Sequence, residues 1–208
     1  MINMRRLLLQ LPAAALCLTS LLAGCASTGG TSELTATSLE SGSTLVPTFA
    51  TMVYRTSDDS SADLYLTDLP LARLADPGDD LRDLQGQIMH VHMFMVPKPG
   101  KTPVDDTACN AAVRHAILSQ GAIGVYGGGG FFQPGSVPGS PVFSGGLRGA
   151  SMRLIRATPN FADRLGNTAM SGRIAADLDE TVSRVIAARM DQLARALPMP
   201  VRADAATR

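Results

Sequence analysis

The chain has 208 residues, carries 18 Lys and Arg against 18 Asp and Glu, and is 45% hydrophobic and 17% charged. A chain with this composition can bury a core, which excludes a wholly disordered or collagen-like protein. The balanced charge provides no basic field, so we expect no nucleic-acid partner.

The first 25 residues have the layout of a secretory signal peptide. Arg5 and Arg6 precede an apolar run over residues 7–22, and the segment ends Leu22-Ala23-Gly24-Cys25. This ending resembles the lipobox of bacterial lipoproteins, in which small residues precede the cysteine that is acylated. The resemblance is confined to residues 1–25, and the remaining residues match no family that we recognise.

The lipoprotein resemblance implies a location for the protein. Residues 1–24 would be removed as a signal peptide, and Cys25 would carry acyl chains such as palmitate that hold the protein on a membrane of the cell envelope. Ala26 and Ser27 follow the cysteine. Because lipoproteins kept at the inner membrane of enteric bacteria have Asp at the first of these positions, the resemblance implies the outer membrane, facing the periplasm, in a cell with two membranes.

Composition divides the rest of the chain. In residues 26–44, thirteen of nineteen residues are Ser, Thr or Gly, which favours a flexible tether because such a stretch buries little apolar surface. We therefore predict a lipidated cysteine and tether over residues 25–45, one globular β-rich domain over residues 46–197, and a frayed tail over residues 198–208.

Several short runs in the first part of the domain are typical of strands. Residues 49–56 and 62–67 predict a hairpin, and residues 70–84 a loop with one helical turn. Residues 87–96 form the clearest strand: Met89 and the odd positions up to Met95 make an apolar face that we assign to the core, while His90 and His92 point to the opposite face.

The middle of the chain is ambiguous. Residues 108–120 fit either a helix capped by one of residues 105–107 or a strand, and we favour a hairpin that returns through Gln120-Gly121 into residues 122–126. The Gly- and Pro-rich residues 127–149 predict an irregular loop. Strands are expected again at residues 150–157 and 169–175.

Residues 177–197 predict an amphipathic helix, with one apolar face and an acidic start at Asp177 and Glu180. Strands at hairpin spacing followed by one helix indicate an α+β protein that is mostly β. The expected fold is an antiparallel sheet or sandwich packed by the C-terminal helix.

His90 and His92 are candidate metal ligands, because two imidazoles on one strand face are a spacing that metal sites use. The candidates for a third ligand are His115, Asp105 and Asp106. Two histidines on a partly polar sheet face also need no metal, so both interpretations stay open. The cofactor prediction is accordingly none, with a divalent metal as the alternative.

The sequence favours a non-enzymatic protein. It contains no GxSxG, HExxH or CxxC motif, and Cys109 reads as a buried thiol. The favoured function is a lipid-anchored envelope lipoprotein whose domain binds a partner or has a structural role. The alternative is a metal-binding or metal-dependent domain. An envelope protein or polymer is the expected partner beside the membrane, and a basic face would suit an acidic one. That face would comprise Arg148, Arg153, Arg156, Arg164 and Arg173.

Overall fold

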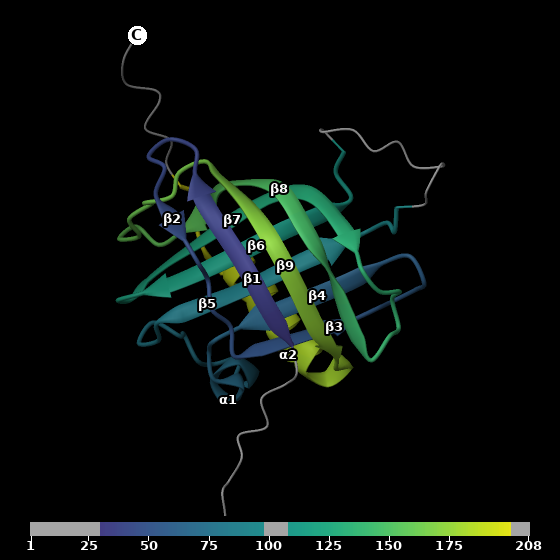
Figure 1. The fold of residues 1–208 in the computed structure, drawn as a ribbon. Helices are drawn as coiled ribbons and strands as arrows, with labels where there is room; N and C mark the ends of the chain where they lie inside the picture. Colours follow the sequence, from purple (N-terminus) through teal and green to yellow (C-terminus); the bar gives the residue numbers. More distant parts are fainter. Residues whose placement is uncertain (1–29, 98–107, 201–208) are drawn as a thin grey trace, which may run out of the picture.

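The computed structural model describes residues 30–97 and 108–200. It is mostly β, with a helix at its C-terminal side, as the sequence predicts (Figure 1). The elements in chain order are β1 (Thr31–Ser38), β2 (Thr44–Leu45), β3 (Thr51–Arg55), β4 (Ala62–Thr67), α1 (Leu71–Ala75), β5 (Gly86–Met93), β6 (Ala111–Ser119), β7 (Ala122–Pro134), β8 (Val142–Ala157), β9 (Thr168–Leu178) and α2 (Glu180–Ala196).

The nine strands of the described residues form one sheet that closes on itself. From β3 to β9 each strand pairs antiparallel with the next, and β9 completes the ring through a short parallel pairing with β3, where Tyr54 lies opposite Leu178. The strand β1 pairs along the same edge of β9, and β2 pairs with β1. Of the two predicted architectures, the structure has the single antiparallel sheet and not the two-sheet sandwich.

The predicted tether is wrong from Thr31 onward, because this part of the Ser- and Thr-rich segment is a strand of the sheet. All eight residues of β1 pair with β9, and Leu34 and Ala36 are buried. Pairing with β9 satisfies the backbone, and alternation sends two apolar side chains inward. The domain therefore starts at or before Thr31 and not near residue 46.

The segment that fitted either helix or strand is β6, in the predicted hairpin with β7. Gln120 and Gly121 form the turn with φ of 51° and 79°. Two consecutive positive φ values are what a tight two-residue hairpin loop requires.

The prediction of an irregular loop at residues 127–149 is wrong. Most of it belongs to β7 and β8, which are long strands joined by residues 135–141. Glycine is needed where β7 and β8 approach closely: a Cβ on Gly128 would lie 1.8 Å from the carbonyl oxygen of Ser151. Glycine-rich composition here reflects close backbone packing inside a sheet and not a loop.

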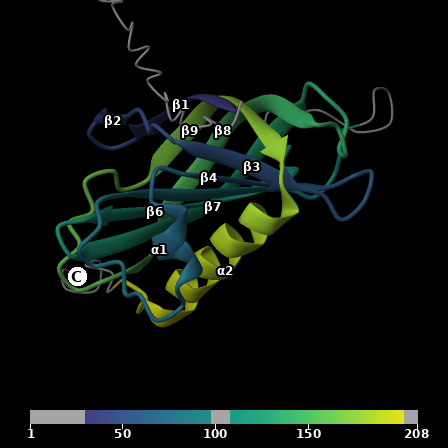
Figure 2. The ribbon, with the colours of Figure 1, turned by 90° about the horizontal axis from the view of Figure 1, so that it is seen from below.

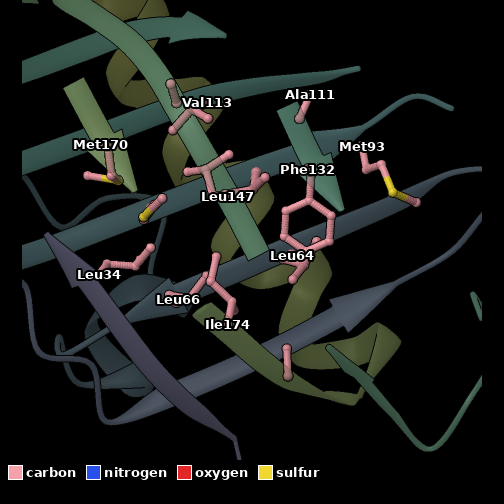
Figure 3. Close-up of a cluster of buried hydrophobic side chains, with 14 of the residues drawn as sticks. Leu34, Leu64, Leu66, Met93, Ala111, Val113, Phe132, Leu147, Met170 and Ile174 are labelled. Carbon is pink, nitrogen blue, oxygen red and sulfur yellow. The ribbon is translucent and has the colours of Figure 1, made fainter. Parts of the chain in front are cut away.

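The inside of the closed sheet is the larger hydrophobic core (Figure 3). Met89, Val91 and Met93 point into it, which confirms the predicted core face of β5. Met95 lies beyond the end of β5 and is 41% exposed, so it does not extend that face. Phe132 stacks on Phe143 within the same core.

A second core lies between the outer face of the sheet and the helices. Figure 2 shows α2 lying along the sheet beside α1, and Ile186, Met190 and Leu193 of α2 are buried there. The helix starts later than predicted, because residues 177 and 178 complete β9. Asp179 caps it by accepting a hydrogen bond from the backbone N–H of Val182 at 2.9 Å.

The closed sheet has two ends, named here after the limits of β1. The Thr31 end also contains the carboxyl ends of β3, β5, β7 and β9, and the Ser38 end contains their amino ends, because neighbouring strands alternate in direction. In the described ranges, no helix combines the length and the apolar character needed to cross a bilayer.

Candidate functional site

Asp63, His90 and His92 come together on the outer face of the sheet. Asp63 lies on β4 directly opposite His92 on β5, and His90 comes two residues before His92 on the same strand. One carboxylate oxygen of Asp63, Oδ1, lies 2.8 Å from Nε2 of His90 and 2.9 Å from Nδ1 of His92. Three nitrogen and oxygen donors thus converge on one point.

The strand period explains why these side chains share a face. The odd positions of β5 fill the interior core, so His90 and His92 face outward, as the sequence predicts. Their surroundings are only partly wet: the side chains of Asp63, His90 and His92 are 15%, 17% and 40% exposed. The group therefore opens to solvent mainly beside His92.

Two neighbouring side chains hold the group. Tyr65 stacks on the ring of His90 with the centroids 4.5 Å apart, and the Nε of Arg55 lies 3.6 Å from Oδ2 of Asp63. The guanidinium of Arg55 also lies 5.6 Å from the centre of the Tyr65 ring. Burial, with smaller contributions from neighbouring charges, raises the pKa of Tyr65 to about 12, so its hydroxyl stays protonated at neutral pH.

Asp63 is ionised in this environment. Burial alone raises the pKa of its carboxyl, but hydrogen bonds and charge from His90 and His92 outweigh burial and bring that pKa below its ordinary value. An ionised carboxylate beside two imidazoles is a donor set that suits a first-row divalent transition metal ion. These are the residues that could hold a metal.

His115 does not join this group. It lies on β6 and points into the closed sheet, where it is completely buried beside Phe49. Its Nε2 lies 2.8 Å from the amide oxygen of Gln87, while its Nδ1 has no hydrogen-bond partner among the described residues. Burial lowers the pKa of His115 to about 4, so the ring is neutral at physiological pH.

The third member of the group is Asp63, which sequence reasoning missed. Asp105 and Asp106, the other candidates, lie outside the described residues. The sequence feature that could have identified Asp63 is strand alternation in residues 62–67. Leu64 and Leu66 face the core, so Asp63 faces outward on β4, the strand next to β5 in the sheet. Its register against His92 depends on the length and path of residues 68–85, which the sequence pattern does not determine.

A second acidic cluster, formed by Asp79, Asp80 and Asp83, has a structural explanation. Arg73 donates hydrogen bonds to the carboxylates of Asp79 and Asp83, and this pairing lowers the pKa of Asp79 to about 2. Because an arginine already occupies it, we assign no metal to this cluster.

The thiol of Cys109 is exposed, which corrects the predicted buried cysteine. It precedes β6 at the Thr31 end, where the Sγ lies 3.5 Å from the carbonyl oxygen of Ala111. His115 is six residues further along and lies inside the sheet, so the two side chains form no catalytic pair.

The arginines predicted to form one basic face lie in several places. Arg148 and Arg173 border a hollow of about 480 Å³ beside Thr31, whereas Arg153 borders a second hollow of about 440 Å³. Arg164 borders a third, of about 790 Å³, at the Ser38 end. Arg156 donates a hydrogen bond to the carbonyl oxygen of Ala194 in α2.

The fold and this group together describe a closed antiparallel sheet that carries an aspartate and two histidines on its outer wall. Comparison with models of protein families, with curated proteins and with solved structures found no match. Any function must therefore be argued from the residues themselves.

Proposed function

We propose that this protein is a lipid-anchored lipoprotein of the cell envelope whose domain binds a divalent transition metal ion through Asp63, His90 and His92. The observation that carries the metal assignment is the convergence of both imidazoles on Oδ1 of Asp63, at 2.8 and 2.9 Å. The proposal assigns no reaction to the domain.

Metal binding would need only a local adjustment. With no metal, each imidazole donates a hydrogen bond to Asp63, whereas a metal would take the lone pairs of Nε2 of His90 and Nδ1 of His92. Both rings would then carry their proton on the other nitrogen, and the three donors would move apart by a few tenths of an ångström. Because protonated imidazole cannot ligate, binding should weaken in acid.

The exposed side of His92 supports a site that is not fully enclosed. Three protein ligands leave at least one position of a tetrahedral ion for water or for a group from a partner. The neighbouring residues Tyr65 and Arg55 would contact the ligand side chains His90 and Asp63 and not the metal ion itself. Stacking on His90 restricts the orientation of that ring, and Arg55 lies beside Oδ2 of Asp63, the carboxylate oxygen that does not contact the histidines.

The metal assignment is tested with the mature full-length chain in detergent, because removal of residues before 46 would delete β1. We expect about one zinc ion per chain by elemental analysis after dialysis against zinc, and loss of binding in His90→Ala with His92→Ala and in Asp63→Asn. Asp80→Asn, in the second acidic cluster, is the matched control and should bind normally. Equal zinc in all variants, or none in the folded wild type, would contradict the assignment.

The anchor is supported by the lipobox that ends at Cys25 and has its own test. Cells fed a radiolabelled fatty acid should label the wild-type chain and not Cys25→Ala, and the label should fractionate with the outer membrane in a cell with two membranes. A Cys25→Ala chain that still takes up label would overturn the lipoprotein assignment.

A second candidate function, non-enzymatic binding of an envelope protein or polymer, is favoured by the hollow of about 790 Å³ at the Ser38 end. Its lining mixes the apolar Ile117, Tyr126 and Phe161 with the polar Ser119 and Arg164. A photo-crosslinking residue at Ser119 should capture this component in intact cells, and one at the exposed Asp59 should not. Identical products from both positions would contradict a site in the hollow.

A further inference from the structure

The Thr31 end of the closed sheet carries most of the exposed apolar side chains. Eight large hydrophobic side chains are exposed among the described residues. Five of them lie at or beyond the strand limits at this end: Phe94, Met95, Val137, Val142 and Leu178. Scattered single exposed hydrophobic residues need no explanation, but their concentration at one end does.

Three of the five come from neighbouring segments. Val137 lies in the connection between β7 and β8 and is 71% exposed. Val142 starts β8, and Leu178 ends β9, with its backbone N–H bonded to the carbonyl oxygen of Pro141 at 2.9 Å. The pairing of Ser144 with Ala175, and of Ala175 with Thr31, places this group next to the point at which the chain enters the sheet (Figure 1).

The distance to the lipidated residue is short. Because the sheet begins at Thr31 and not near residue 46, only six residue steps separate it from Cys25. Even a fully extended chain covers about 20 Å over six steps. An acylated Cys25 lies at the membrane surface, so the Thr31 end must stay within about that distance of the lipid headgroups.

The polar residues at this end are compatible with phospholipid headgroups. Arg148 and Arg173 are exposed and border the same hollow as Thr31, and guanidinium groups bind phosphate in a bidentate manner. Glu33 lies opposite Arg173 on β1, so the local charge is mixed. Arg148 lies further along the wall, next to Leu147, which pairs with Gly172 opposite Leu34, so apolar contact is the main interaction that this end offers.

We propose that the Thr31 end of the sheet lies against the phospholipid surface that holds the anchor, with Val137, Val142 and Leu178 in contact with the interface. The proposal rests on the lipid anchor of the proposed function. It adds an orientation: the Ser38 end, with its hollow of about 790 Å³, faces away from the membrane.

The chain contains no tryptophan, which makes a direct test practicable. Val137→Trp and Leu39→Trp place a single fluorophore at opposite ends of the sheet, at positions that are 71% and 64% exposed. Leu39 follows β1, eight residues beyond Thr31, or about 26 Å along the strand. The two lipidated full-length variants are reconstituted into phosphatidylethanolamine and phosphatidylglycerol vesicles that contain a headgroup spin-labelled lipid.

We expect the spin label to remove most of the emission of Val137→Trp and little of the emission of Leu39→Trp. Equal quenching of both variants, or stronger quenching of Leu39→Trp, would overturn the orientation, as would self-association that protects Val137→Trp from the label. Failure of the anchor is distinguishable, because an unacylated chain would not float with the vesicles at all.

Discussion

The phenol ring of Tyr65 lies flat on the imidazole of His90, with the ring centroids 4.5 Å apart and the planes inclined by 6°. The two residues are direct cross-strand partners of β4 and β5. The pairing of β4 with β5 therefore places the Tyr65 ring against His90, a candidate metal ligand. This stacking restricts how the imidazole can rotate.

Removal of this stack should weaken metal binding without removing a ligand. We expect Tyr65→Leu to lower zinc affinity by about tenfold, because His90 would lose the surface that orients it. Tyr65→Phe retains the ring and should bind zinc nearly as the wild type does. Titration calorimetry on both variants checks this, and equal affinities for Leu and Phe would show that the stack has no orienting role.

Arg189 should be the most costly charged side chain of α2 to replace. It is 2% exposed, and it donates hydrogen bonds to the carbonyl oxygen of Arg73 in α1 and to those of Asp76 and Asp79 in the connection that follows α1. Arg189→Met would leave these acceptors unpaired, and we expect a loss of about 2–4 kcal/mol in the free energy of unfolding.

The matched control for Arg189 is Arg195→Met on the exposed side of the same helix. Its effect should stay within about 0.5 kcal/mol in urea titrations followed by circular dichroism. If Arg189→Met proved as mild as the control, the attachment of α2 to the α1 connection would not depend on this guanidinium.

Stability should fall as the pH decreases from about 6.5 to 4, and His115 is a main cause. Burial lowers the pKa of its imidazole from 6.5 to about 4. Over this interval the unfolded chain binds a proton that the folded chain does not, which opposes folding by about 3 kcal/mol at the acid end. Well above pH 6.5 the imidazole is neutral in both the folded and the unfolded chain, so His115 does not oppose folding there.

The variant His115→Gln tests the assignment of this pH dependence. It removes the titrating group but keeps a polar side chain beside Gln87. Urea midpoints measured between pH 7.5 and 4 should fall less steeply for the variant than for the wild type. If the urea midpoints of the variant and the wild type fell equally with pH, other titrating groups would be the cause of the loss of stability in acid.

Gly128 should not tolerate a side chain. A Cβ there would lie 1.8 Å from the carbonyl oxygen of Ser151 on the paired strand, so β7 and β8 would have to separate. We expect Gly128→Ala to lower the free energy of unfolding by about 2 kcal/mol or more. Gly146→Ala on β8 is the control, because its nearest neighbour would be 3.9 Å away, and urea titration should find it close to the wild type.

The local sequence pattern was sufficient to predict the structure of a segment that buries one of its faces or turns back on itself. Alternation in β5 predicted that Met89 would face the core and that His90 and His92 would share the outer face, and the turn at Gln120-Gly121 predicted the hairpin of β6 with β7. In each case the signal lies within about ten residues and follows from the strand period or the turn geometry.

Pairing between distant segments decided the rest. The Ser- and Thr-rich β1 is a strand because β9, more than 130 residues later, supplies its backbone partners, and Gly128 lies in a strand because another backbone approaches it. Asp63 meets His92 only through the register of β4 against β5. The sequence alone predicted the core face of β5 and the amphipathic helix, and the structure confirms both. Only the tertiary structure decided where the sheet begins and which carboxylate meets the histidines, because both depend on long-range register.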